Sequence, residues 1–257
     1  MMARFRIFCF SVVLFLSAFS TTAYSLDQEN YELVKDFKAA FLKGDKREIS
    51  TFFKFPLKRE KPIRSIRTSE ELTERFEEVF DQHLSDIINS SDIHEDWDAV
   101  GWRGIMLQNG VLWMDYDGKI MAINYQSEIE KALQHRLINT ERKNLHKSLT
   151  VFEQPVLDWQ TKRFRVRIDE MDDHKYRYAS WSKDKSPLTK PDLVLSDGAW
   201  VPDGSGGNHY YIFKNGTYTY KVYVYVLGTD TTQIGVLDVY KNDKKLLSED
   251  FIKIMKP

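Results

Sequence analysis

The stretch VGWRGIMLQNGVLWMDYDGKIMAINY (residues 100–125) decides the fold of the first half of the chain. Apolar and polar side chains alternate in three runs, at residues 100–107, 111–114 and 120–125, and a period of two is typical of strands. Asn109-Gly110 and Asp117-Gly118 lie between the runs, and such dipeptides favour the positive φ angles of tight hairpin turns. The stretch therefore predicts a three-stranded antiparallel meander.

The residues before this meander have a helical period. Apolar side chains recur three and four residues apart between residues 30 and 50, and Gly44-Asp45 interrupts them, with Asp45 as the cap of a short second helix. The sequence FKFPL at residues 53–57 predicts a short strand, Ser69 is the expected cap of a third helix, and residues 84–88 add a helical turn. Helices followed by a meander predict an α+β unit, with the helices on one face of the sheet.

These elements resemble a known family. Two helices, the FKFPL strand, a further helix and a curled sheet containing Trp102-Arg103-Gly104-Ile105 and residues 109–113 are similar to the NTF2-like (SnoaL-like) cone fold over about residues 28–125. The resemblance implies helices on a curved antiparallel sheet that often encloses a pocket. Its members range from isomerases and dehydratases to non-catalytic binding modules, so the fold does not select a function.

The second half of the chain has a different pattern. Residues 127–148 predict a long helix that links two domains, and from residue 149 the helical period disappears. Short strand-like runs then alternate with turns such as Asp197-Gly198 and Asn215-Gly216, which predicts a small all-β sandwich or barrel. The expected organisation is a leader at 1–25, an NTF2-like domain at 26–126, a linking helix at 127–148 and an all-β domain at 149–257.

Residues 1–25 have the composition of a secretory signal peptide. Arg4 and Arg6 precede an uncharged apolar run at residues 7–19, which is too short to cross a bilayer. Ala23 and Ser25 supply the small residues that a signal peptidase requires, so cleavage is expected before Leu26. An uncleaved membrane anchor is the alternative. The sequence therefore predicts a periplasmic or secreted protein with no membrane span after cleavage.

Cleavage changes the composition in two ways. The leader carries two of the 37 basic residues and none of the 38 acidic ones, so the formal net charge falls from −1 to −3, which gives no basis for a nucleic-acid partner. It also removes Cys9, the only cysteine, and with it disulfides, a cysteine nucleophile and thiolate metal ligands. We expect no cofactor and no metal site. The oligomeric state is left open.

Catalytic signals are weak. In a cone-fold pocket, an Asp/His pair would exchange protons near neutral pH, and the candidates are Asp115, Asp98, His94 and His83. Asp115 follows a predicted strand, where it points either into the cone or to solvent beside the turn. The acidic stretch around His94 lacks the fixed spacing of a metal motif and is interpreted as a solvated loop. The basic residues around Pro62 are interpreted in the same way; they are Lys58, Arg59, Lys61, Arg64 and Arg67.

Binding signals lie in the second half. Arg163, Arg165 and Arg167 alternate with apolar residues, so they share one strand face, either as an anion-binding surface or paired with nearby acids. Tyr223 and Tyr225 share a face of another strand, where tyrosines serve a binding surface or stabilise the sheet. We therefore expect an exported, non-catalytic binding protein for an envelope glycan or protein. The alternatives are a small-molecule enzyme with an NTF2-like pocket and a periplasmic inhibitor or immunity protein.

Overall fold

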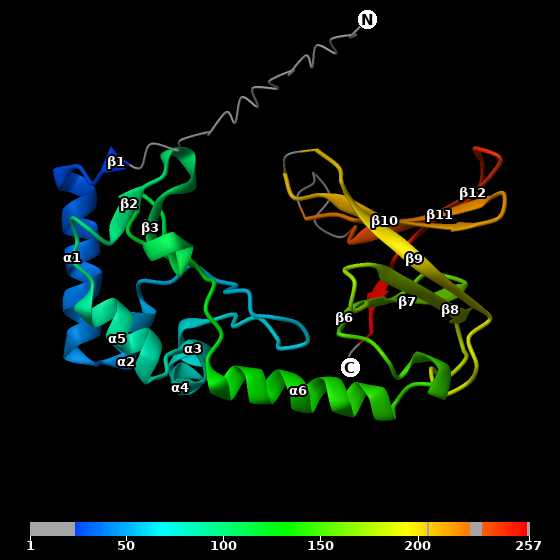
Figure 1. The fold of residues 1–257 in the computed structure, drawn as a ribbon, viewed down its shortest axis with the longest axis horizontal. Helices are drawn as coiled ribbons and strands as arrows, with labels where there is room; N and C mark the ends of the chain where they lie inside the picture. Colours follow the sequence, from blue (N-terminus) through cyan, green and yellow to red (C-terminus); the bar gives the residue numbers. More distant parts are fainter. Residues whose placement is uncertain (1–23, 205, 227–232, 256–257) are drawn as a thin grey trace, which may run out of the picture.

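The computed structural model describes residues 24–204, 206–226 and 233–255, so the predicted leader lies almost entirely outside the described residues. Two units lie side by side, and helix α6 (Glu128–Lys143) runs beneath both of them (Figure 1). The first unit combines helices with a small sheet, and the second is a large antiparallel sheet. The predicted α+β class is confirmed. No helix in the described residues is long and apolar enough to cross a membrane.

The helices of the first unit begin at residues that cap them. The side chains of Asp27, Asp45, Thr68 and Asp81 each accept a hydrogen bond from a backbone N–H of the following helix. The cap of the third helix is Thr68, not the predicted Ser69. The helices are α1 (Gln28–Lys43), α2 (Lys46–Ser50), α3 (Ser69–Glu74), α4 (Phe76–Val79) and α5 (Gln82–Ser90).

The small sheet is an antiparallel meander in the order β1-β2-β3-β4-β5. Its strands are β1 (Tyr24–Ser25), β2 (Trp97–Ala99), β3 (Ile105–Leu107), β4 (Leu112–Met114) and β5 (Ile120–Ile123). The single strand predicted at 100–107 is wrong. A 3₁₀ turn at Gly101–Arg103 separates β2 from β3, because Gly101 and Gly104 adopt φ angles of 52° and 96° that end the extended backbone.

Side chains fill the space between this sheet and the helices. Phe37 of α1 and Trp97 of β2 are fully buried, with their ring centroids 6.3 Å apart. Ile105, Leu107, Leu112 and Met114 of the sheet have no exposed surface either. The first unit therefore has a packed core where an NTF2-like enzyme would need an open cavity.

Helix α6 is shorter than predicted and is anchored to the first unit by a buried ion pair. Ser127 caps its start, and it ends at Lys143, five residues before the expected boundary. Arg59 donates from Nε to Glu130 Oε1 over 2.6 Å, and also to the carbonyls of Ile123 and Tyr125. The two charged side chains are 3% and 0% exposed. Arg59 is thus a buried anchor, and its prediction as part of a solvated loop is wrong.

The second unit is one sheet of nine strands, neither a two-sheet sandwich nor a closed barrel. Its order is β13-β12-β11-β10-β9-β8-β7-β6-β14 and every neighbouring pair is antiparallel. The strands are β6 (Gln154–Gln160), β7 (Phe164–Glu170), β8 (Tyr176–Ser182), β9 (Leu193–Pro202), β10 (His209–Asn215), β11 (Tyr218–Val224), β12 (Gly235–Lys241), β13 (Lys244–Asp250) and β14 (Lys253–Ile254).

This sheet curls until its two ends approach each other. The N–H of Phe251 donates to Gly235 of β12, and the next N–H, of Ile252, donates to Gln160 of β6. The chain thus crosses from one end of the sheet to the other within two residues. The inner face holds the main core, which includes Val166, Ile168 and Phe213. The predicted barrel is therefore right in that the sheet is strongly curved, and wrong in that the sheet does not close.

The outer face of the sheet is covered on one side only. Ile138 of α6 and Leu149 and Phe152 after it pack against Ala179 and Trp181 of β8. Figure 1 shows α6 on the side of β6, β7 and β8, whereas none of the described helices lies over β10, β11 and β12. The outer face of β10, β11 and β12 is therefore left uncovered by the described helices.

Candidate binding surfaces

Tyrosines lie side by side on the uncovered outer face. Register pairs Tyr210 of β10 with Tyr223 of β11, and their ring centroids are 5.1 Å apart. Tyr225 directly follows β11, with its ring centroid 6.5 Å from that of Tyr223, and Lys221 places its ammonium 5.0 Å from the ring of Tyr210 and 5.5 Å from that of Tyr240. We call Tyr210, Lys221, Tyr223, Tyr225 and Tyr240 the tyrosine face. All five residues are partly exposed.

A buried carboxylate lies on the same side of the sheet as the tyrosine face, opposite Lys221. Asp238 is 4% exposed and accepts hydrogen bonds from Tyr240 over 3.0 Å and from Ser248 over 2.6 Å, while Lys245 lies 2.6 Å away. Burial alone would raise the pKa of Asp238, but Lys245, Ser248 and Tyr240 hold it below its usual range. The charged carboxylate thus fixes the position of the Tyr240 hydroxyl.

The tyrosine side chains of this face are also partly shielded from solvent. Burial against their neighbours raises the pKa values of Tyr223 and Tyr225. As in any tyrosine at neutral pH, their hydroxyl groups are protonated and able to donate and accept hydrogen bonds. Each ring offers a partner an apolar surface and a polar tip.

Two of the three arginines predicted to share a strand face, Arg165 and Arg167, lie on β7, whereas Arg163 lies in the bend before it, and the three differ in exposure. Arg163 is 61% exposed and pairs with Glu249 of β13. Arg165 makes a bidentate pair with Asp158, at 2.8 and 2.5 Å. Arg167 is only 3% exposed, because the end of α6 covers it. All three guanidinium groups are thus paired with acids, as the second of the two interpretations predicted, and an accessible anion-binding surface is wrong at Arg167.

Arg167 is the centre of a buried charge network. Its Nη2 lies 2.9 Å from Glu141 of α6 and 2.6 Å from Asp169, and Nη1 lies 4.0 Å from Asp158. Asp169 pairs in turn with Arg177 at 2.6 Å. Desolvation, with Asp169 and Asp158 adding to it, raises the pKa of Glu141 despite the nearby Arg167. The network contains three arginines and three carboxylates, and it joins α6 to the sheet.

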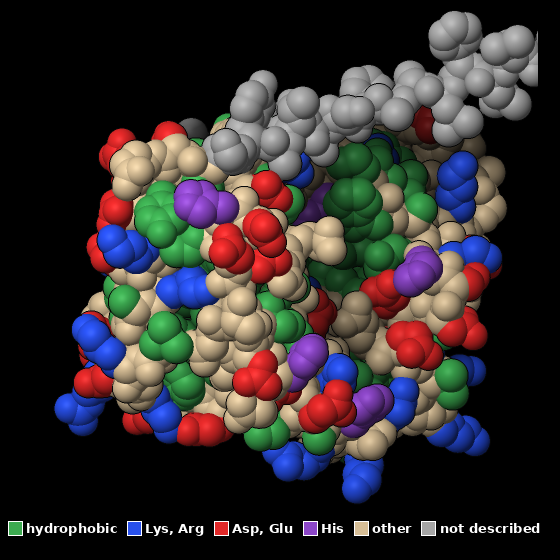
Figure 2. All heavy atoms as spheres, turned by 60° about the vertical axis from the view of Figure 1, so that its left-hand side comes forward, with side chains coloured by type: hydrophobic (Ala, Val, Ile, Leu, Met, Phe, Trp, Pro, Cys, Tyr) green, Lys and Arg blue, Asp and Glu red, His purple; other side chains and the backbone are tan. Residues whose placement is uncertain are grey.

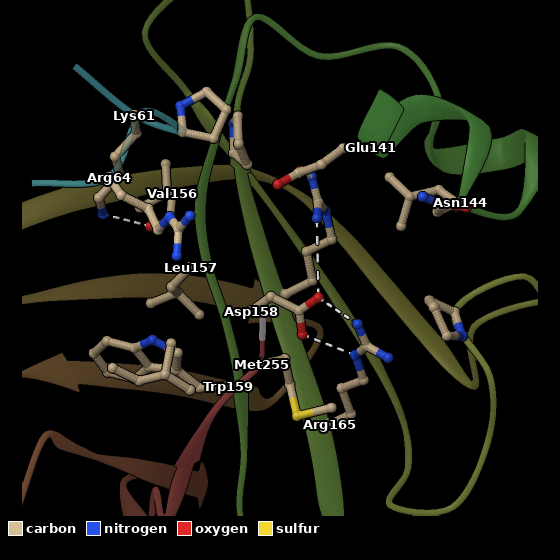
Figure 3. Close-up of a pocket in the computed structure, with 16 residues that line it drawn as sticks. Lys61, Arg64, Glu141, Asn144, Val156, Leu157, Asp158, Trp159, Arg165 and Met255 are labelled. Atoms are coloured by element: carbon tan, nitrogen blue, oxygen red, sulfur yellow. Dashed lines mark hydrogen bonds and ion pairs between the residues drawn. The ribbon is translucent and has the colours of Figure 1, made fainter. Parts of the chain in front are cut away.

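A groove of about 600 Å³ lies beside this network, between the two units. It follows the edge of β6 that β14 leaves unpaired, and the 61–64 segment of the first unit forms its opposite wall. Lys61 donates to the carbonyl of Val156, and Arg64 points over Leu157 (Figure 3). Figure 2 shows a hollow between the units, with hydrophobic side chains inside it and charges of both signs around it.

The weak catalytic candidates are not brought together. Asp115 Oδ1 accepts from the N–H groups of Asp117 and Lys119, and its other oxygen pairs with Lys54. Burial would raise its pKa, but these contacts lower it, so Asp115 is a poor proton carrier near pH 7. His94 stacks on Tyr31 at 4.9 Å, and Asp98 lies on β2 beside β1. His83 is on α5, with its ring 5.9 Å from that of Tyr125.

The acidic stretch is a hydrogen-bonded turn. Asp92 accepts from the N–H groups of His94 and Glu95, and Asp96 accepts from that of Asp92 and from the side chain of Gln108. Within residues 24–204, 206–226 and 233–255, no group of three or more His, Cys, Asp or Glu is placed to hold a metal ion.

Sequence reasoning missed the groove because its walls come from distant segments. Lys61 and Arg64 carried a usable signal, a dense basic stretch beside a proline, but nothing in the sequence showed that it faces β6. Glu141 was indistinguishable from the solvated residues of its helix. No family model matches the chain, and no curated protein or solved structure is significantly similar to it, so the NTF2-like resemblance stays a prediction from sequence.

Proposed function

We propose that the protein is an exported, non-catalytic binding protein and that its tyrosine face binds an envelope glycan. The observation that carries the proposal is the row of partly exposed tyrosines on the half of the sheet that no described helix covers. Tyrosine rings pack against the apolar faces of sugar rings, and their hydroxyl groups hydrogen-bond to sugar hydroxyls. Export rests on the composition of residues 1–25.

The support of the face favours binding over a purely structural role. Tyr240 is held by the buried Asp238, and Lys221 lies between two rings. Binding surfaces gain affinity when their aromatic side chains are already ordered before the ligand arrives. The same rings leave their outer surfaces free of contacts from α6, which covers the other half of the sheet.

The enzyme alternative has less support. An NTF2-like active site would need an open cavity with an Asp/His pair, whereas the core of the first unit is filled and Asp115 is bound into a hairpin turn. The inhibitor or immunity alternative would use the same tyrosine face against a protein, so a ligand test separates it from glycan binding.

The test is a calorimetric titration of the purified protein with soluble fragments of envelope glycans. Replacing Tyr223 and Tyr225 with alanine should weaken binding about tenfold for each ring, because central aromatic anchors contribute more than about 1.4 kcal/mol. Tyr116→Ala is the matched control, since Tyr116 is a 43% exposed tyrosine of the first unit. Absence of glycan binding, or an affinity of Tyr223→Ala and Tyr225→Ala equal to that of the unmodified protein and of Tyr116→Ala, would refute the proposal.

A further inference from the structure

We propose that the groove between the two units is a second binding site, for an amphipathic anion that carries a carboxylate or phosphate headgroup on an apolar body. The inference is independent of the tyrosine face, which lies on other strands of the sheet. A volume of about 600 Å³ falls within the range of small-molecule sites. Its chemistry divides into a cationic wall and an apolar wall.

The apolar wall is formed by side chains from three parts of the chain. Leu145 follows α6, Leu157 and Trp159 belong to β6, and Met255 follows β14. Figure 3 shows Trp159 and Met255 together below the edge of β6. Trp159 is held in place by Phe251, with ring centroids 5.3 Å apart. An apolar body placed here removes hydrocarbon surface from water on both sides.

The groove lining carries an excess of positive charge. Four basic and two acidic residues line the groove, and both acids are already neutralised, Asp158 by Arg165 and Glu141 by Arg167. Neither Lys61 nor Arg64 forms an ion pair among the described residues, and the Lys61 ammonium donates to the carbonyl of Val156. Desolvation lowers the pKa of Lys61, with Lys58 adding to the effect and Glu60 opposing it, and a nearby anion would favour the charged ammonium.

The Arg64 guanidinium lies over the apolar wall, and the Lys61 ammonium contacts the edge of β6 beside it. Figure 3 places the Arg64 guanidinium directly above Leu157, with Trp159 beyond it. A headgroup bound by Arg64 therefore has its body directed along the edge of β6. In addition, the buried Nε of Arg167, another lining residue, has no hydrogen-bond partner among the described residues. The excess positive charge of the cationic wall excludes cationic ligands and disfavours uncharged ones.

The experiment titrates the full chain with ligands that share one alkyl body and differ in headgroup, followed by calorimetry. Decanoate and decyl phosphate, each below its micelle concentration, should bind saturably at one site. Decanol should bind at least about tenfold more weakly, and decyltrimethylammonium should not bind, because charge-assisted hydrogen bonds supply that difference. The tighter of the two anions identifies the headgroup.

Variants of the cationic wall complete the test. Arg64→Gln and Lys61→Gln should each weaken decanoate and decyl phosphate binding about tenfold. Arg67→Gln removes an equal charge from the same segment at a position that does not line the groove, so its affinity should equal that of the unmodified protein. All three side chains are at the surface, and an unchanged melting temperature confirms folding. Failure of both anions to bind, or equal affinity in all three variants, would overturn the proposal.

Discussion

Replacing Arg167 with methionine should destabilise the protein strongly, because the buried network would then hold three carboxylates and two cations. Met approximates the length of Arg, so the change removes the charge with little loss of volume. Glu141, which is 11% exposed, would keep no cation within 4.0 Å among the described residues. Removing one partner from a buried ion pair costs about 3–5 kcal/mol, and we expect that loss in the free energy of unfolding at pH 7.

The assay is urea unfolding followed by tryptophan fluorescence, to which the fully buried Trp181 beside α6 contributes. Glu141→Gln alone should cost much less, about 1 kcal/mol, because it removes a charge that burial already disfavours. Combined with Arg167→Met, it should recover part of the larger loss, since the neutral amide needs no cation. A loss below about 1 kcal/mol for Arg167→Met, or no recovery in the double variant, would refute this account of the network.

The stability of the Arg167→Met variant should depend on pH in a defined direction. The folded-state pKa of Glu141 is raised above 4.5 even with Arg167 in place, and it should rise further without it. The folded state then binds a proton more tightly than the unfolded state, so the free energy of unfolding increases as pH falls through the folded pKa toward the unfolded value. The deficit of Arg167→Met should therefore shrink between pH 7 and pH 5.

Two further predictions concern the second unit. Gly198→Ala should lower the free energy of unfolding by at least about 2 kcal/mol, because the new Cβ would lie 2.1 Å from the ring of the buried Phe213; a small effect in thermal unfolding would contradict the packing. Asp238→Asn should cost about 2 kcal/mol at pH 7 by weakening the contacts with Lys245 and Tyr240. Because the folded pKa of Asp238 is lowered, its contribution is present above about 3.8 and is lost as pH falls through the folded pKa. The difference in unfolding midpoint between this variant and the unmodified protein should therefore disappear in acid, and a pH-independent difference would contradict it.

Local patterns predicted most of the elements. Asp45 and Gly44 mark a helix boundary through interactions within four residues, and the alternation in residues 112–114 reflects burial of one strand face. These signals depend only on neighbouring residues, which is why they are visible in the sequence. The division of the chain into two units near residues 127–148 was visible in the sequence for the same reason. The spacing of apolar residues changes there from period two to a helical period and back.

Tertiary contacts explain the errors. Arg167 and Arg163 occupy equivalent positions of one strand pattern, but α6 covers only the first, and nothing in the strand itself reveals where a distant helix packs. The approach of the two ends of the sheet depends on the N–H groups of Phe251 and Ile252, which donate to Gly235 of β12 and Gln160 of β6. The groove combines both problems, since Arg64 and Leu157 belong to different units.

The length of α6 sets the distance between the two units. Glu130 and Glu141 are eleven positions apart, about three helical turns, so both carboxylates project from one side of the helix and each binds an arginine of a different unit. Inserting one residue between them would rotate one carboxylate by about 100° away from its arginine. The spacing of the units therefore tolerates changes only in nearly whole turns of about 5.4 Å, and the width of the groove is stepped rather than continuously adjustable.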